Sequence, residues 1–239
     1  MPYRHLAAHY DGLMEEFGYE RYAEYLLSLI GERRRVLDLA CGTGRLAEIL
    51  AGHGCDVVAV DASPEMLSVA MGREIPGVQF IRQDMAELDL FGTVEAAFCT
   101  LDALNYLKTP EKLRETFRRV RLFTEPGGVF IFDMLTPKAL KARDGEAFMS
   151  DSKDAYCVWR CRFEEPFCRQ EVTLFTKRRG NLWERRREIH TERAFPLEDV
   201  EAALLGAGFA AVTQYGLLTY DAPSEGADRV VFIAAAPEG

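Results

Sequence analysis

The feature of this sequence that most constrains its fold is a buried apolar run that ends in a glycine-rich turn. The run Val36–Ala40 predicts a strand, the turn contains Gly42 and Gly44, and a helix-patterned stretch follows over 45–53. Glycines at this place let the backbone turn tightly and approach a ligand closely at the N-terminus of the helix. A second apolar run ends at Asp61, where a carboxylate can accept hydrogen bonds from two ribose hydroxyls. Together these features predict a ligand site at one edge of a parallel sheet.

The chain around this turn alternates short apolar runs with longer helix-patterned stretches as far as residue 133. This alternation predicts a parallel sheet with helices on both faces. After residue 135 apolar and polar residues alternate, which predicts an antiparallel meander. We expect strands over 36–40, 56–61, 78–82, 94–99, 129–133, 155–163, 168–177, 182–191, 210–219 and 229–235, and helices over 21–30, 45–53, 110–123 and 196–205 and from Ser63 onward.

Charge and composition exclude several kinds of partner. The formal net charge of −9 argues against a nucleic acid as the main partner. No apolar stretch approaches the roughly 20 residues that a membrane span needs, and the first residues lead into no apolar run typical of a secretory leader. The six cysteines form no CxxC pair, so we expect reduced thiols, no metal site and a cytoplasmic location.

The charge of Asp38 separates two interpretations of the glycine turn. Gly42, Gly44 and Ala47 also fit the G-x-G-x-x-A pattern of nicotinamide-dinucleotide sites, although one such match is weak evidence. Asp38 lies where the strand enters the turn, and a pyrophosphate there would meet a like charge in a partly desolvated site. A ligand with an ammonium and a sulfonium, such as S-adenosylmethionine, would be attracted instead. Asp38 therefore favours a cationic ligand over a dinucleotide.

Several ordered motifs resemble those of the class I S-adenosylmethionine-dependent methyltransferases. Residues 38–44 resemble their first motif, with Ala40 in place of its first glycine, and Asp61 with the residues after it resembles the second. Residues 83–85 resemble the adenine-binding element, and 98–106 resemble the motif beneath the sulfonium. The resemblance covers about 22–133 and 195–235, and it includes the glycine turns at 125–128 and 206–209.

The resemblance implies an α/β fold, with a doubly wound seven-stranded Rossmann-like sheet and an antiparallel β lid insertion. The sequence is most similar to bacterial small-molecule methyltransferases that begin with a Tyr-Asp-x-x-Met segment, here Tyr10–Met14. We expect an N-terminal helical segment over the cofactor site, 1–34. We expect the S-adenosylmethionine-binding core over 35–135 and 195–239, and a β-rich acceptor lid over 136–194.

The same resemblance implies which residues bind the cofactor. Asp38 and the glycine turn would hold the methionyl part, Asp61 the ribose, and Asp84 with the backbone of Met85 the adenine. Each residue also has an ordinary structural interpretation as a helix cap, a strand end or core, so only their joint occurrence carries weight. The set expected to bind S-adenosylmethionine, and S-adenosylhomocysteine as product, is Tyr10, Tyr22, Asp38, Ala40, Gly42, Gly44, Asp61, Ala62, Met66, Gln83, Asp84, Met85, Cys99 and Leu101.

Three residues are candidates for work on the acceptor. A base is needed only when the nucleophile is protonated in its resting form. His190 ends the insertion, and the ordinary pKa of histidine, about 6.5, suits proton removal; a surface histidine on an edge strand is the alternative interpretation. Asp102 and Asn105, with Tyr106, lie near the sulfonium by motif and could orient the acceptor, although Asp102 could equally cap a helix.

The sequence therefore predicts a methyltransferase that acts on a small molecule. One alternative is an RNA methyltransferase, for which the basic runs 177–179 and 185–187 would have to form a binding surface. Another is an NAD(P)-dependent oxidoreductase, and a third is a cofactor-binding protein that has lost activity. An exposed lid edge could pair with a second copy, which leaves a homodimer open.

Overall fold

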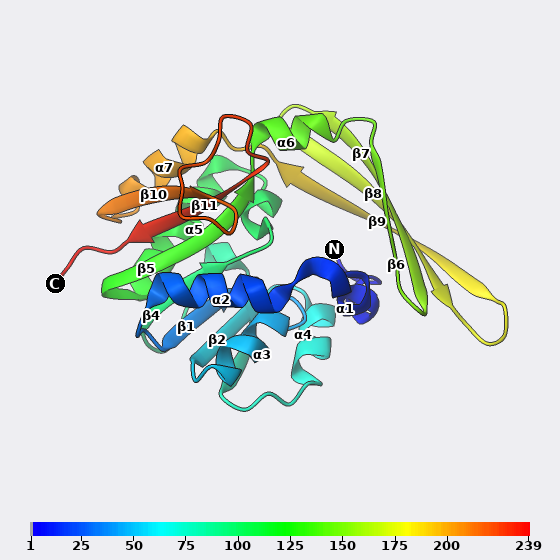
Figure 1. Cartoon of the computed structure of the whole chain (residues 1–239), viewed down its shortest axis with the longest axis horizontal. Coiled ribbons are helices and arrows are strands. Elements are labelled where there is room, and N and C mark those ends of the chain that lie inside the picture. The colour runs from blue at the N-terminus through cyan, green and yellow to red at the C-terminus, as the bar shows by residue number, and fades with distance from the viewer. Residues whose placement is uncertain (1) are drawn as a thin grey trace.

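A seven-stranded mixed sheet forms the centre of the structure, a computed structural model that describes residues 2–239 (Figure 1). The strand order is β10-β11-β5-β4-β1-β2-β3, and β11 runs antiparallel to both of its neighbours while the other pairs are parallel. This confirms the predicted doubly wound seven-stranded sheet. The strands are β1 (Arg35–Leu39), β2 (Asp56–Asp61), β3 (Val78–Arg82), β4 (Val94–Cys99), β5 (Thr124–Leu135), β10 (Ala211–Gly216) and β11 (Arg229–Ala235).

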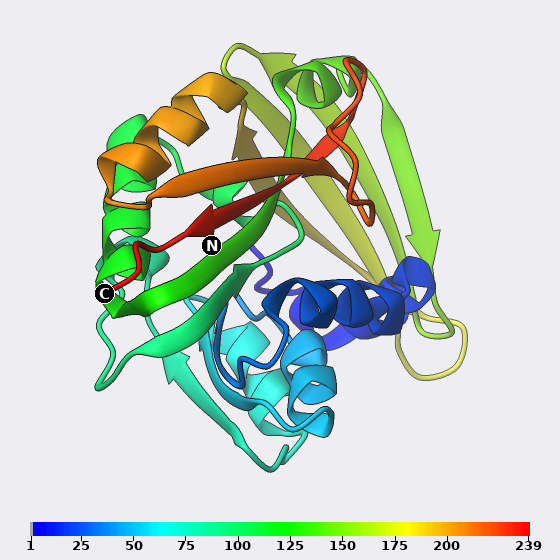
Figure 2. The same ribbon diagram turned by 60° about the vertical axis from the view of Figure 1, so that its left-hand side comes forward.

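Helices cover both faces of this sheet, as its continuous apolar strands require (Figure 2). Along β1, Leu37 packs on the α5 and α7 face together with Phe117, while Val36 packs on the α2 and α3 face together with Leu26. Asp38 has the same parity as Val36, so its side chain belongs to the α2 and α3 face. The helices are α1 (Tyr10–Leu13), α2 (Tyr19–Ile30), α3 (Arg45–Gly52), α4 (Pro64–Met71), α5 (Pro110–Phe123), α6 (Pro137–Ala142) and α7 (Leu197–Gly206).

A second, four-stranded antiparallel sheet lies between β5 and α7 in the sequence and extends beyond the core (Figures 1 and 2). We call it the insertion sheet. Three of its strands match the predicted meander, whereas the edge strand β6 and the short helix α6 were not predicted, because neither shows a clear period in its apolar residues. Its strands are β6 (Ala147–Asp151), β7 (Ala155–Glu164), β8 (Phe167–Lys177) and β9 (Trp183–Arg193).

The fifth strand begins earlier than the sequence predicted. The helix before it ends at Phe123 as expected, but β5 starts at Thr124 and passes through the glycine pair that we expected to be a turn. The register between β4 and β5 shifts near Val94, and a Cβ on Gly128 would lie 2.8 Å from the Glu95 carbonyl oxygen. The glycine is therefore needed for close backbone approach, which a turn prediction misses.

Residues 2–18, here called the N-terminal segment, join the core to the insertion sheet. The segment contains α1 and the short 3-10 helices η1 (Ala7–His9) and η2 (Glu15–Phe17). Leu6 and Leu13 pack against Cys157, Val172 and Leu174 of the insertion sheet. Met1, the first residue of the expected segment 1–34, lies outside the described residues. No helix within residues 2–239 is long and apolar enough to cross a membrane.

Candidate cofactor and acceptor site

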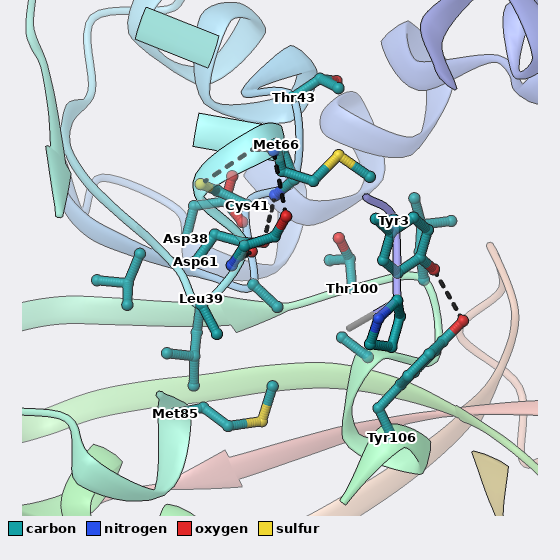
Figure 3. A pocket seen from close by; sticks show the side chains of 18 of the residues that line it. Tyr3, Asp38, Leu39, Cys41, Thr43, Asp61, Met66, Met85, Thr100 and Tyr106 are labelled. Carbon is teal, nitrogen blue, oxygen red and sulfur yellow. Dashed lines mark hydrogen bonds between the residues drawn. The ribbon is translucent and has the colours of Figure 1, made fainter. Parts of the chain in front are cut away.

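A cavity of about 320 Å³ opens at the carboxyl edge of the central sheet (Figure 3). It lies where the strand order reverses between β1 and β4, the usual ligand position in doubly wound sheets. Its volume falls within the range of about 300–1,000 Å³ typical of small-molecule sites. The lining includes Pro2, Tyr3, Tyr10, Tyr19, Asp38, Ala40, Cys41, Gly42, Thr43, Asp61, Ala62, Ser63, Met66, Gln83, Asp84, Met85, Thr100, Leu101, Tyr106 and Lys108.

Asp38 gives the cavity a buried acidic group without a partner. Its side chain is 1% exposed, and no described residue forms a hydrogen bond with its Oδ2 atom. Burial, with the nearby charge of Asp61, raises the pKa of Asp38 to about 7. An unpaired buried carboxylate is costly, and a cation in the cavity would offset that cost. The residue fits the ammonium and sulfonium of S-adenosylmethionine.

The turn after β1 is held in a conformation that favours glycine. Ala40, Gly42 and Gly44 have φ angles of 63°, 57° and 75°. Ala40 therefore adopts a left-handed conformation that costs a non-glycine residue roughly 1 kcal/mol. Gly44 lies outside the cavity lining, but a Cβ there would approach the Phe80 ring to 3.0 Å. The two glycines thus act differently, since Gly42 borders the cavity and Gly44 lets α3 begin close to Phe80.

Asp61 fastens this turn to the end of β2. Its Oδ2 atom accepts the Gly42 N–H at 2.9 Å, and its Oδ1 atom accepts the Ser63 N–H at 2.7 Å. Burial raises the pKa of Asp61 despite these bonds. Each carboxylate oxygen retains a second acceptor position, so Asp61 can also receive two ligand hydroxyls. Ser63 then caps α4, because its Oγ atom accepts the Met66 N–H at 3.2 Å, at the place where the sequence predicted a helix to begin.

A third set of residues borders the cavity after β3. Asp84 Oδ1 accepts the Ala86 N–H at 2.9 Å, which starts the short helix η3 (Met85–Glu87). The side-chain amide of Gln83 pairs with both backbone groups of Asp89 and so fixes this loop. Figure 3 shows the thioether side chains of Met66 and Met85, from α4 and η3. This wall offers an apolar surface and a half-exposed carboxylate, which suits a flat heterocycle.

The turn after β4 is strained and is held by Asp133. Leu101 and Asp102 have φ angles of 57° and 51°, a left-handed pair without glycine that costs roughly 1 kcal/mol at each residue. Asp133 accepts the Leu101 N–H at 2.7 Å and the Asp102 N–H at 2.9 Å. It also accepts hydrogen bonds from the Tyr22 hydroxyl and from Arg229. Asp133, which the sequence marks only as the end of an expected strand, therefore positions the turn that carries Leu101 into the cavity.

Several residues expected in the site do not line the cavity. Tyr22 turns inward because its hydroxyl is bonded to Asp133, and Cys99 is buried against the α5 side of the core. Asp102 is engaged in an ion pair with Arg229, and burial raises its pKa although Arg229 lowers it. The expected residues outside the lining are Tyr22, Gly44, Cys99, Asp102, Asn105 and His190.

Asn105 has a structural position that its motif did not suggest. Its side chain is fully buried, its Oδ1 accepts the Leu135 N–H at 3.0 Å, and its Nδ2 donates to the Leu135 carbonyl at 3.2 Å. The same Nδ2 donates to the Arg193 carbonyl at 2.9 Å. Asn105 thus joins the end of β5 to the end of β9. All of these bonds go to backbone groups, so the amide is not free to orient an acceptor.

His190 is buried rather than exposed on an edge strand, so the surface interpretation is wrong. Its side chain is 1% exposed, and its Nδ1 atom lies 2.9 Å from the Tyr106 hydroxyl. That hydroxyl lies 2.8 Å from the hydroxyl of Tyr3, and both tyrosines line the cavity (Figure 3). The imidazole therefore reaches the cavity only through Tyr106. No sequence motif marks Tyr3 as a site residue. It meets Tyr106 only through a contact between residues that are 103 positions apart in the sequence.

Three of the six residues in the basic runs 177–179 and 185–187 of the insertion sheet form ion pairs with acids. Arg178 and Arg186 both form ion pairs with Glu184, and Arg187 pairs with Glu171. These are exposed pairs at the β8–β9 end of the sheet, and none of them borders the cavity. They agree with a solvated strand surface.

Comparisons with known proteins agree with this geometry. The family model described as a methyltransferase domain matches residues 36–128. The chain is 32% identical over 240 residues to YqeM, a putative methyltransferase of Bacillus subtilis, covering 98% of this chain and 97% of that protein.

Two solved structures resemble nearly the whole chain in fold. An S-adenosylmethionine-dependent methyltransferase from Clostridium acetobutylicum has a TM-score of 0.87 at 27% identity, covering 98% of this chain and 99% of that chain. CalS10, an amino pentose methyltransferase from Micromonospora echinaspora with the cofactor bound, has a TM-score of 0.74 at 24% identity, covering 98% of both chains. At that identity the likeness to CalS10 concerns the fold alone.

Proposed function

The chain belongs to the class I S-adenosylmethionine-dependent methyltransferases, and from this premise we propose that it methylates a small molecule held at the tyrosine end of the cavity. The observation that carries the proposal is that acidic residues and tyrosines line opposite ends of the cavity. Asp38 and Asp61 lie at one end, and Tyr3 and Tyr106 lie at the other (Figure 3). S-adenosylmethionine, when bound, supplies an electrophilic methyl group on a positively charged sulfur.

In this proposal the acidic end holds the cofactor. Asp38 meets the positive charges of the methionyl part, and Asp61 accepts the ribose hydroxyls on the free positions of its oxygens. Asp84 and the backbone of Met85 receive the adenine, with Met66 on its face. This assignment leaves Thr100 and the two tyrosines of the other end for the acceptor. The protein then acts mainly by aligning the acceptor with the methyl group and excluding water.

The N-terminal segment supports an acceptor of limited size. Asp11 accepts a hydrogen bond from the Thr43 hydroxyl and forms an ion pair with Arg73, which also donates to the Thr43 carbonyl at 2.9 Å. These contacts hold the segment against the glycine turn, where it covers the cavity. A folded RNA would have to displace them, and three of the six residues in the basic runs are already paired with acids. CalS10, whose acceptor is an amino pentose, offers a related precedent for a small acceptor.

The test follows the methyl group. The purified protein is incubated with methyl-labelled S-adenosylmethionine and, in separate reactions, with amino-sugar nucleotides, simple phenols and bulk RNA. The proposal predicts label in a low-mass product together with an equal amount of S-adenosylhomocysteine. Label that enters RNA and none of the small acceptors would contradict it. The Thr43→Val variant loosens the segment and is expected to raise the KM for the acceptor.

A further inference from the structure

Resting on the proposed function, we infer that Tyr3, Tyr106, His190 and Glu188 form a proton relay that takes a proton from the acceptor. The relay implies that the acceptor's nucleophile is a nitrogen or oxygen that arrives carrying a proton, such as an ammonium group or a hydroxyl. It also implies that the relay is complete only while the N-terminal segment is docked.

The four side chains form one continuous chain of hydrogen bonds. The Tyr3 and Tyr106 hydroxyls are 2.8 Å apart, Tyr106 Oη lies 2.9 Å from His190 Nδ1, and His190 Nε2 lies 3.1 Å from Glu188 Oε2. The Tyr3 ring also contacts the imidazole edge-on at a centroid distance of 4.6 Å. The residues come from the N-terminal segment, from the short helix η4 (Ala103–Tyr106) and from β9. Only the two tyrosines border the cavity.

The direction of the hydrogen bonds follows from the acid at the far end. Glu188 Oε1 accepts the backbone N–H groups of His5 and Leu6. Burial acts to raise the pKa of Glu188, but the hydrogen bonds from His190 and from these two N–H groups outweigh it and leave the pKa lowered. Glu188 is therefore ionised and accepts a hydrogen bond from Nε2–H of His190. The neutral imidazole then has only Nδ1 as an acceptor, and it receives the Tyr106 hydroxyl proton.

Assigning each hydroxyl proton in turn leaves the oxygen of Tyr3 as a hydrogen-bond acceptor that faces the cavity. The single O–H of Tyr106 is given to His190, so Tyr106 Oη accepts the O–H of Tyr3. The Tyr3 oxygen then keeps a free lone pair at the cavity wall. Burial, with smaller electrostatic contributions, raises the pKa of both tyrosines well above the usual value. Neither hydroxyl therefore stays ionised, and each can pass a proton on.

The chemical step balances across this chain. As the acceptor–CH₃ bond forms, the S–CH₃ bond breaks and its electron pair stays on sulfur. An ammonium acceptor loses a proton before it attacks, because its nitrogen has no free electron pair, whereas a hydroxyl can lose its proton as the new bond forms. In either case the acceptor's proton passes to Tyr3 Oη, the Tyr3 proton to Tyr106 Oη, and the Tyr106 proton to His190 Nδ1. The imidazolium that results faces the Glu188 carboxylate, which stabilises it. A carbon nucleophile without an acidic proton would make no use of this chain.

Other ionisable groups act on the relay. Cys157 lies near Glu188, Lys108 lies 5.8 Å from the centroid of the Tyr106 ring, and the charges of Asp102 and Glu192 raise the pKa of Tyr3 and of Tyr106. Asp102 and Glu192 are themselves paired with Arg229 and Arg143, so their charges are largely balanced. Glu188 is the carboxylate in direct contact with His190.

Docking of the N-terminal segment assembles the relay. Tyr3 is part of that segment, and the N–H groups that fix Glu188 belong to His5 and Leu6. Release of the segment would remove the group that faces the acceptor and the donors that keep Glu188 ionised. Proton removal is thereby coupled to closure over the cofactor.

The test is nuclear magnetic resonance of isotope-labelled histidine ring nitrogens, with S-adenosylhomocysteine as the bound probe. The His190→Gln variant identifies the signals of His190. The expected result is a neutral Nε2–H imidazole at high pH that takes up one proton reversibly without unfolding. In Tyr106→Phe the chemical shift of Nδ1 should move to the value of a ring nitrogen that accepts no hydrogen bond. In Glu188→Gln the midpoint of protonation should fall by about one pH unit or more, a tenfold change.

A matched control comes from a tyrosine outside the relay. Tyr25→Phe removes another largely buried hydroxyl, one that donates to the Thr219 carbonyl, and should leave the His190 signals unchanged. The relay would be overturned by an Nδ1–H imidazole or by a His190 that does not titrate in the folded protein. It would also be overturned if the His190 signals of Tyr106→Phe were the same as those of the unaltered protein. Calorimetry with S-adenosylhomocysteine separates the two proposals. Absence of binding by the unaltered protein would overturn the proposed function, whereas binding together with an Nδ1–H imidazole would overturn the relay alone.

The acceptor provides a second check once the labelling experiment has identified a product. Tyr3→Phe should lower kcat about tenfold or more for an N- or O-methylated product while leaving affinity for S-adenosylhomocysteine unchanged. A product methylated on carbon, or a kcat unaffected by Tyr3→Phe, would contradict the relay.

Discussion

Acidification should weaken binding of S-adenosylmethionine through Asp38. In the ligand-free protein the pKa of this buried carboxyl is about 7, because burial and the charge of Asp61 disfavour its ionised form. At about pH 8 the group is therefore mostly ionised, whereas at about pH 5 only about one molecule in 100 carries the charge. If the cationic cofactor binds the ionised form, its Kd rises about 100-fold over this range, which corresponds to about 2.7 kcal/mol.

The assay is calorimetric titration across this pH range, repeated in two buffers that differ in ionisation enthalpy. Near pH 6 binding should release close to one proton, because the cofactor draws the pKa of Asp38 below the solution pH. The raised pKa of Asp61 acts in the same direction. The matched control is Asp38→Asn, which should bind weakly at every pH and lose most of the proton release.

Stability should follow the same titration with a known sign. The pKa of Asp38 is higher in the folded protein than in the unfolded chain, so folding is penalised progressively as the pH rises from about 4 to about 7. The cofactor offsets this penalty, and it should therefore raise Tm more at about pH 8 than at about pH 5. A Kd that changes less than about threefold over the range, or an undiminished change in Asp38→Asn, would refute the reasoning.

Three further predictions concern residues that shape the site. Asp133→Ala should lower the free energy of unfolding by about 3 kcal/mol in urea denaturation, because it leaves Arg229 with one partner fewer and frees a strained turn; a loss below about 1 kcal/mol would contradict this. Gly44→Ala should cost about 2 kcal/mol because it adds a steric clash to a left-handed backbone, whereas Gly42→Ala, with open space, should cost about 1 kcal/mol in the same assay. Asn105→Ala should cost about 2 kcal/mol yet leave the affinity for S-adenosylhomocysteine unchanged, and a variant that loses affinity but not stability would give Asn105 a direct role in the site.

The fold was largely predictable because its signals are local. The strands over 56–61, 78–82, 94–99 and 229–235 have the predicted bounds, since each is a short apolar run between turn residues. The cap at Ser63 was also predictable, because Ser-Pro at a helix start acts within a few residues of sequence. The early start of β5 was missed, since Gly128 serves close packing there rather than a turn.

The site was predictable on the cofactor side and much less so on the acceptor side. Asp38, Asp61 and Asp84 lie within two residues of the carboxyl ends of β1, β2 and β3, so the order of the strands brings them to one edge. Tyr3 and His190 meet only because the N-terminal segment docks on the insertion sheet, and no periodic pattern encodes that contact. The inward turn of the Tyr22 hydroxyl depends in the same way on Asp133, far away in the sequence.

The measurement that tests the assignment of the cavity most directly is calorimetric titration of S-adenosylhomocysteine and NADH into the unaltered protein and into Asp61→Ala. A thermal melt confirms that the variant is folded. The account predicts micromolar binding of S-adenosylhomocysteine by the unaltered protein, loss of most of that affinity in the variant, and no heat with NADH. Binding of NADH, or an affinity for S-adenosylhomocysteine that is unchanged in Asp61→Ala, would contradict the account.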